Sequence, residues 1–132
     1  GPGGAGPVLD NFDADAVARY LRRFEELLAR LPAPGLRCAF NDSWEVYGAT
    51  GTPGFPARFR RERGYDLAPH LAEWMGDGDP DDAARVRADV RRTGEELVRD
   101  DFVGAWTRWA HARGLRTRNQ AHGSPGNLLD LY

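Results

Sequence analysis

The sequence contains no lysine, so all 18 of its basic residues are arginine. With 20 acidic residues, the formal net charge is -2, which gives no overall attraction to nucleic acid or to an anionic membrane. We attribute the exclusive use of arginine to coding bias in a GC-rich genome rather than to selection for a partner. Neither nucleic acid nor a membrane is therefore an expected partner.

Cysteine is nearly absent as well. Cys38 stands alone, which excludes an internal disulfide framework and a cysteine-based zinc site. No apolar run approaches the length of a membrane span and no segment resembles a signal peptide, so the sequence does not decide localisation. The chain begins without Met and stops at Tyr132 within an apolar pattern. This predicts that residues 1–132 are a fragment of a larger protein that continues beyond both termini.

The composition that remains, with 41% hydrophobic and 29% charged residues, is typical of a globular domain. Apolar residues recur at helical spacing behind the possible caps Asp13 and Asp15, which predicts a helix over residues 14–31. Residues 32–35 (PAPG) end this helix and lead into an apolar strand that begins at Leu36. The helical stripe consists of Val17, Tyr20, Leu21, Phe24, Leu27, Leu28 and Leu31.

The middle of the chain is predicted to be helical. We interpret the basic segment 58–63 as a solvated helix face rather than an anion site, and expect a short helix over residues 67–75. An Asp-Pro-Asp-Asp start predicts a long helix over residues 81–112. Gly94 and Gly104 weaken its continuity, so we expect a break or kink near one of them.

A second strand is predicted over residues 115–121, followed by a loop and a helix that Asn127 caps. Two helix-to-strand units argue for a parallel α/β sheet or barrel. The strands start 79 positions apart, at residues 36 and 115, whereas a βαβ unit needs only about 30 residues. We therefore interpret residues 47–75 as an elaboration on the carboxyl side of the first strand.

Two carboxylates and an indole follow the first strand. In α/β folds, ligands bind at the carboxyl ends of strands. An indole face stacks on the C–H face of a sugar, while carboxyl groups bind hydroxyls or protonate a glycosidic oxygen. Asp42, Trp44 and Glu45 are therefore candidate glycan-binding or catalytic residues. The alternative is a polar loop in which Asp42 and Ser43 form a turn and Glu45 is solvated.

The second strand also ends in polar residues. Asn119, Gln120 and His122 carry no carboxylate but can hold hydroxyls, and His122 could instead orient a carboxylate. Ser124 is followed by proline and lacks the Gly-x-Ser-x-Gly elbow, so a serine hydrolase is not expected. Asp10, which follows a possible short strand, is the one other carboxylate in the chain that could serve as a catalytic base.

A metal site is a further possibility at the strand ends. Asn41, Asp42, Glu45 and His122 could contribute ligands, and their oxygen atoms would suit calcium better than zinc. The spacing does not require a metal, so the metal ligands stay unassigned.

Residues 40–46 (FNDSWEV) resemble the Asp-Ser-(Trp/Tyr)-Glu strand-end motif of the α-L-rhamnosidases of glycoside hydrolase family 106. Residues 52–55 (TPGF) and 63–67 (RGYDL) are similar to the same family, as are residues 106–111 (WTRWAH) and 114–127 (GLRTRNQAHGSPGN). The chain departs from the family pattern at Thr50-Gly51, where a Trp is expected, at Asp101, where Asn is usual, and in residues 93–96, which are irregular.

The resemblance implies an α/β fold, namely an incomplete (β/α)8 TIM-barrel fragment with parallel strands and long helices. It also implies calcium-assisted, inverting hydrolysis of terminal α-L-rhamnosides in oligosaccharides or polysaccharides. Glu45 would be the general acid, and the second carboxylate would lie beyond Tyr132. Asp42, Trp44, Asn119, Gln120 and His122 would contact the sugar. A barrel glycosidase for another sugar, such as a galactoside, and a non-catalytic carbohydrate-binding barrel remain as alternatives.

Overall fold

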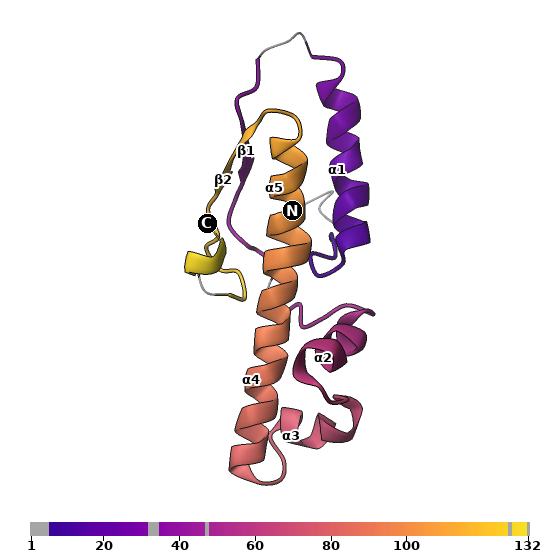
Figure 1. Cartoon of the computed structure of the whole chain (residues 1–132), viewed down its shortest axis with the longest axis vertical. Helices are drawn as coiled ribbons and strands as arrows, with labels where there is room; N and C mark the ends of the chain where they lie inside the picture. The colour runs from indigo at the N-terminus through magenta and orange to yellow at the C-terminus, as the bar shows by residue number, and fades with distance from the viewer. Residues whose placement is uncertain (1–5, 32–34, 47, 127, 132) are drawn as a thin grey trace.

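The computed structural model describes residues 6–31, 35–46, 48–126 and 128–131. Its centre is a long helical rod along which the other elements are arranged (Figure 1). The rod consists of α4 (Pro80–Leu97), the π-helical turn η2 (Val98–Val103) and α5 (Gly104–His111). The side chain of Asp79 caps α4 by accepting bonds from the backbone N–H groups of Asp81 and Asp82, and Pro80 occupies the first turn. The predicted long helix is therefore present.

The expected interruption of that helix is the π-helical turn, which ends immediately before Gly104. The N–H of Gly104 bonds to the carbonyl of Arg99, five residues back, instead of to that of Asp100. The guanidinium of Arg108 lies 3.4 Å from the carbonyl oxygen of Asp100 and compensates for the lost helical bond. The irregularity therefore lies at Gly104 rather than at Gly94, and it is a change of hydrogen bonding within a continuous helix rather than a break.

Helix α1 (Ala14–Leu28) lies alongside α5 (Figure 1). The side chain of Asp13 caps it by accepting a bond from the N–H of Asp15. Val17 and Leu21 are buried against Trp106 of α5. The helix ends three residues earlier than predicted, at Leu28, where Ala29 and Arg30 form a turn. The proline-rich segment predicted to end it lies at residues 32–34, outside the described residues.

The two strands are parallel neighbours, as predicted. Strand β1 (Cys38–Asn41) pairs in register with β2 (Arg116–Asn119), so that Cys38 lies opposite Arg116 and Asn41 opposite Asn119. Both strands are shorter than predicted, with four residues each. A 3-10 turn, η3 (Leu128–Leu131), follows in place of the last predicted helix. The predicted cap of that helix, Asn127, lies outside the described residues.

Residues between the strands form a helical unit against the lower half of the rod, in agreement with the predicted elaboration. It contains α2 (Phe55–Arg63), η1 (Ala68–His70) and α3 (Leu71–Met75), and both α helices pack on α4 (Figure 1). The interpretation of residues 58–63 as a solvated face was wrong for two arginines. The side chains of Arg58 and Arg63 are mostly buried and paired with carboxylates of the rod.

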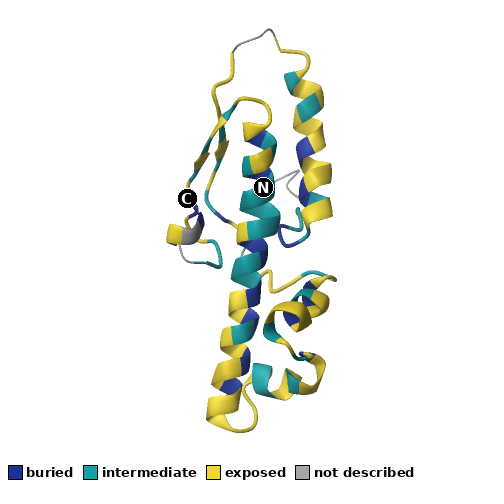
Figure 2. Cartoon of the chain, in the orientation of Figure 1, coloured by how far each residue is buried: buried dark blue, intermediate teal, exposed yellow. Residues whose placement is uncertain are grey.

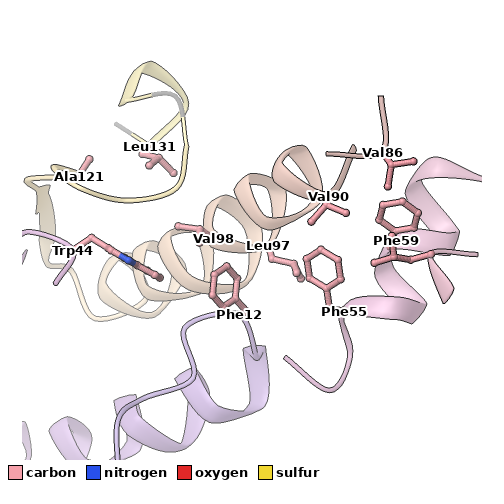
Figure 3. Close-up of a cluster of buried hydrophobic side chains, with 11 residues drawn as sticks. Phe12, Trp44, Phe55, Phe59, Val86, Val90, Leu97, Val98, Ala121 and Leu131 are labelled. Carbon is pink, nitrogen blue, oxygen red and sulfur yellow. The ribbon is translucent and has the colours of Figure 1, made fainter. Parts of the chain in front are cut away.

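The main core runs along the rod rather than forming a compact ball (Figures 2 and 3). At one end Phe55 and Phe59 of α2 pack on α4, and at the other end Trp44 meets the residues that follow β2. Among the described residues, no helix has both the length and the apolar character needed to cross a membrane. The core members are Phe12, Trp44, Phe55, Phe59, Leu67, Val86, Val90, Leu97, Val98, Ala121 and Leu131.

Candidate active site at the strand ends

An amide pair joins the carboxyl ends of the two strands. Asn41 Nδ2 donates to Asn119 Oδ1 over 2.9 Å, and the N–H of Gln120 donates to the carbonyl of Asn41 over 3.0 Å. Parallel register places these residues side by side, so the polar segments after both strands emerge at the same edge. The predicted parallel pairing of the two strands thus brings the two polar segments together.

The two candidate acids, Asp42 and Glu45, are both exposed at this edge. Asp42 Oδ1 accepts a bond from the N–H of Ser43 over 2.8 Å, and Ser43 Oγ donates to Glu45 Oε1 over 3.1 Å. The turn-forming role foreseen for Asp42 and Ser43 is thus present. This turn leaves the carboxylate of Glu45 accessible to solvent.

Trp44 points the opposite way, into the core. Its side chain is 8% exposed and meets Phe12 and Phe102 in edge-to-face contacts, with ring centroids 5.9 Å and 6.0 Å away. Its Nε1 donates to the carbonyl of Val46 over 3.1 Å. Burial of this large apolar ring stabilises the loop that carries Glu45. Sugar stacking by Trp44 stays a prediction, and in this chain the indole also has a structural role.

The three candidate residues at the end of β2 and beyond it differ in how available their side chains are. The amide of Asn119 is used internally, because Nδ2 donates to the carbonyl of Leu131 over 2.9 Å while Oδ1 accepts from Asn41 and from the N–H of Ala121. Gln120 and His122 are exposed. The carbonyl of His122 accepts a 2.8 Å bond from the N–H of Trp44, which ties the two strand-end segments together.

Two residues that were not singled out for the site shape this connection. Ala121 and Gly123 both have positive φ angles, of 56° and 80°. Ser124 Oγ donates to the carbonyl of Ala121 over 2.8 Å, so Ser124 has a structural role in the turn. The sequence offered a weak signal for Gly123, a glycine within a short polar loop. It offered none for Ala121, because alanine rarely adopts this conformation.

Two carboxylates of η2, those of Asp100 and Asp101, have shifted pKa values. Arg58 from α2 reaches Asp100 Oδ2 over 2.6 Å and Asp101 Oδ2 over 3.7 Å. Hydrogen bonding from Arg99 and then from Arg58 lowers the pKa of Asp100, although burial opposes this change. Burial raises the pKa of Asp101. These groups join α2 to the rod and are separate from the exposed pair, Asp42 and Glu45.

The strand-end residues do not enclose a sugar by themselves. The space between Asn41, Asp42, Asn119 and Ser124 measures about 10 Å³, which is room for a single water molecule at most and far below the volume of a monosaccharide site. Within the described ranges, no three side chains of His, Cys, Asp or Glu gather closely enough to hold a metal ion. The donor set therefore does not make a calcium site on its own, and calcium stays a prediction.

The chain is similar to known proteins both in sequence and in structure. The sequence model of glycoside hydrolase family 106, described as alpha-L-rhamnosidase, matches residues 1–130. No curated protein sequence matches the chain. Among solved structures, the chain is similar to a rhamnosidase from Novosphingobium sp. PP1Y, with a TM-score of 0.84 and 28% sequence identity. The match covers 96% of this chain but 13% of the other, so the chain spans about one-eighth of that enzyme's length.

Proposed function

Because the chain belongs to the α-L-rhamnosidase family of glycoside hydrolases, family 106, we propose that it is the acid-bearing segment of an enzyme that hydrolyses terminal α-L-rhamnosides with inversion. The observation that carries this proposal is the family match over residues 1–130 together with an exposed Glu45 in the segment that follows a parallel strand, four residues after its end. A rhamnose-containing oligosaccharide or polysaccharide is the proposed substrate.

Glu45 is the proposed general acid. Its carboxyl group gives a proton to the glycosidic oxygen while the bond from that oxygen to the anomeric carbon breaks. A water molecule attacks the anomeric carbon from the opposite face and loses a proton to a second carboxylate. Ser43 Oγ contacts Oε1 of Glu45, so we assign the transferred proton to Oε2. Asp42, Gln120 and His122 are the proposed contacts for sugar hydroxyls. Trp44 and Asn119 are proposed to hold these residues in place through their buried and hydrogen-bonded contacts.

The base is proposed to come from another part of the enzyme. An inverting mechanism needs two carboxyl groups roughly 6.5–9.5 Å apart on opposite sides of the sugar. Asp42 is three residues from Glu45, on the same segment. Asp10 is engaged in a turn, where its Oδ1 accepts from the N–H of Phe12 over 3.0 Å and its carbonyl accepts from the N–H of Asp13 over 3.3 Å. Neither is a suitable partner for Glu45.

We also propose that the strands belong to a (β/α)8 barrel. The side chains of Cys38 and Phe40 lie on one face of the sheet and are exposed, whereas Ala39 and Asn41 on the other face are partly buried. A cavity of about 530 Å³ runs along all four residues of β1 between α1 and α5. Its lining is mostly apolar and includes Tyr20, Phe24, Leu28, Leu36, Trp106 and Trp109.

A parallel strand from the same enzyme is the occupant that this cavity fits. The cavity follows the backbone of β1, where an adjoining strand would find hydrogen-bonding partners, and α1 and α5 cover it as crossover helices cover a parallel sheet. The similar rhamnosidase has a chain about eight times longer than the matched part, which leaves ample length for further strands. The exposed face with Cys38 and Phe40 would then line the barrel interior.

The experiment that tests Glu45 uses the full-length enzyme. Glu45→Gln should reduce turnover of a natural rhamnoside by on the order of 10²–10⁴-fold, the usual contribution of a positioned acid. The loss should be much smaller for an aryl α-L-rhamnoside with a good leaving group, which needs little protonation. Glu26→Gln, at an exposed position on α1, is the matched control and should leave both rates unchanged.

Three results would contradict parts of this proposal. Equal losses on natural and aryl substrates would remove the acid role from Glu45. Turnover of galactosides in preference to rhamnosides would point to a different barrel glycosidase. Binding of a rhamnoside without hydrolysis by the wild-type enzyme would identify a non-catalytic carbohydrate-binding barrel.

A further inference from the structure

We propose that Gly123 is a positioning residue for Glu45, a role that rests on the proposed function of Glu45 as the acid. Gly123 follows β2, while Glu45 follows β1, 78 positions earlier in the chain. Their connection is the backbone of Trp44, which the loop after β2 holds on two sides.

The first contact is a hydrogen bond. The N–H of Trp44 donates to the carbonyl of His122 over 2.8 Å. The second contact is steric. A Cβ placed on Gly123 would lie 2.8 Å from the carbonyl oxygen of Trp44, a distance that non-bonded Cβ contacts essentially never show. That carbonyl belongs to the peptide group joining Trp44 to Glu45. The loop therefore fixes the orientation of the peptide group that precedes Glu45, and with it the direction in which the Glu45 side chain leaves the backbone.

The loop that provides these contacts is itself held rigidly. Ala121 has a φ angle of 56°, an unusual value for a residue with a side chain, and is 4% exposed. It belongs to the same core cluster as Trp44 and Leu131 (Figure 3). The hydroxyl of Ser124 bonds to its carbonyl over 2.8 Å. The position of Gly123 is thus determined by the core beneath it.

Backbone placement matters here because Glu45 is exposed. The side-chain contact described for its carboxylate is the 3.1 Å bond from Ser43, which belongs to the same segment. A bond within the segment cannot place that segment relative to β2 and its proposed sugar ligands, Gln120 and His122. The contact of Gly123 with Trp44 does so. A displacement of about 1 Å of a catalytic group can reduce a rate by on the order of 10²-fold.

The decisive experiment introduces the missing Cβ in the full-length enzyme. Gly123→Ala should lower kcat on a natural rhamnoside by roughly 10- to 100-fold with KM changed by less than about threefold. The loss should be smaller on an aryl rhamnoside with a good leaving group. The alkaline limb of the pH profile of kcat/KM should also move, because that limb reports the ionisation of the acid.

Two glycine substitutions serve as matched controls. Gly126→Ala places the same methyl group in the same loop, where φ is not positive and the nearest atom is Leu131 Cδ1 at 3.4 Å. Gly64→Ala imposes the same backbone strain, at a φ of 83°, in open space at the end of α2. Both enzymes should keep the wild-type kcat and pH profile. Gly123→Asn is the second test variant, since Asn tolerates positive φ and still carries the Cβ.

Each outcome decides the matter. If Gly123→Ala and Gly123→Asn behave like Gly126→Ala, or lose activity equally on both substrates, Gly123 does not position the acid. If both variants fail to fold while Gly64→Ala folds, Gly123 serves stability and the inference is wrong. Glu45→Gln is measured alongside: if it retains full activity, the proposed acid fails, whereas a Glu45→Gln loss beside a normal Gly123→Ala enzyme overturns the positioning role alone.

Discussion

Trp44 serves two regions of the molecule at once. Its ring joins Phe12 and Phe102 in the core, while its backbone holds the start of the exposed segment that carries Glu45. A residue in this position affects the proposed site mainly through the placement of its neighbours. Because this ring is buried, a substitution of Trp44 should affect stability and turnover more than substrate affinity.

Trp44→Phe tests this in the full-length enzyme. Loss of ring area and of the bond to the Val46 carbonyl should destabilise the fold by roughly 2 kcal/mol and lower the apparent melting temperature, with KM for a rhamnoside within about threefold of wild type. Trp74→Phe, a partly buried ring on α3 away from the strand ends, is the control and should affect stability alone. A large rise in KM for Trp44→Phe with unchanged stability would instead support direct sugar stacking.

At the level of residues, sequence reasoning placed the candidate residues at the strand ends but did not reveal the contacts that each of them makes. Asp42 and Glu45 were expected at a strand end, and both are exposed there. Asn119 was expected to bind sugar, yet its amide is occupied by Asn41, Ala121 and Leu131. A linear sequence does not reveal such partners, because they come from residues up to 78 positions away.

Among the elements, the attachment of α2 to α4 depends on a buried ion pair. Arg63, whose side chain is 8% exposed, pairs with Glu96 and also donates to Thr93 Oγ1 over 3.2 Å. The Thr93 hydroxyl in turn donates to the carbonyl of Asp89 over 2.8 Å. Burial alone would raise the pKa of Glu96, but the hydrogen bonds and charges of Arg63 and Arg92 outweigh it, so the pKa is lowered.

Arg63→Met should therefore loosen α2 selectively. Removing one partner of a buried pair costs about 3 kcal/mol, and Glu96 would keep only Arg92, whose side chain is 70% exposed, as its partner. Hydrogen exchange of residues 55–63 in the full-length enzyme should accelerate roughly 100-fold. Arg91→Met is the control, since the Arg91 side chain is 74% exposed and lies 3.8 Å from Glu95. Equal exchange rates in the two variants would show that the buried pair contributes little.

The same pair predicts a pH dependence. Because the pKa of Glu96 is lower in the folded state than its ordinary value of 4.5, its contribution to stability is present above that pH and is lost as the pH falls through the folded value. Glu96→Gln should thus be less stable than wild type at neutral pH. The difference in melting temperature between the two proteins should narrow below about pH 4.5. A constant difference from pH 7 to pH 3 would contradict this assignment.

Most elements were predictable because their signals are local. Asp13 and Asp79 cap helices whose apolar spacing is visible in the sequence, and α1 and α4 begin at the residues that follow them. Helix α2 was less clear, because its arginines obscure the buried Phe55 and Phe59. Sequence spacing marks which side chains can share a face. It does not indicate that Arg58 and Arg63 find carboxylates on a helix 30 or more positions later.

The molecule as a whole presents apolar surface that another part of the enzyme is expected to cover. Phe40 is 54% exposed on the open face of the sheet, and β1 borders the 530 Å³ cavity. An uncovered strand beside an apolar cavity favours association. The parallel strand pair was predictable from the two helix-to-strand units. The closure of a barrel requires strands other than these two and therefore stays a proposal.

The isolated chain should therefore differ sharply from the full-length enzyme. Alone, it should bind a hydrophobic dye, aggregate or melt without a sharp transition, and fail to hydrolyse an aryl α-L-rhamnoside, with or without calcium. Its single thiol, Cys38, should react readily with a bulky maleimide, since it is exposed beside the cavity. In the full-length enzyme that thiol should be protected.

In the full-length enzyme, labelling of Cys38 is measured as the difference between the wild type and the Cys38→Ser variant. Equal reactivity of Cys38 in both proteins would contradict the proposed adjoining strand. A soluble monomeric chain with a sharp thermal transition would mean that it folds independently. Turnover by the isolated chain that Asp10→Asn abolishes would place both carboxylates within these residues.

The π-helical turn lets the rod hold one residue more than a regular helix of the same length. Its bonds run five residues back along the chain, as the bond from Gly104 to Arg99 shows, so each of its residues rotates the chain by less than the roughly 100° of an α-helical residue. Loss of one codon between Val98 and Val103 would therefore restore a regular helix and leave α5 in nearly the same orientation relative to α4. Loss of one codon within α4 would instead rotate every later element of the rod by about 100°. The turn is thus a place where the rod can gain or lose one residue without separating the strand ends from the helical unit beside them.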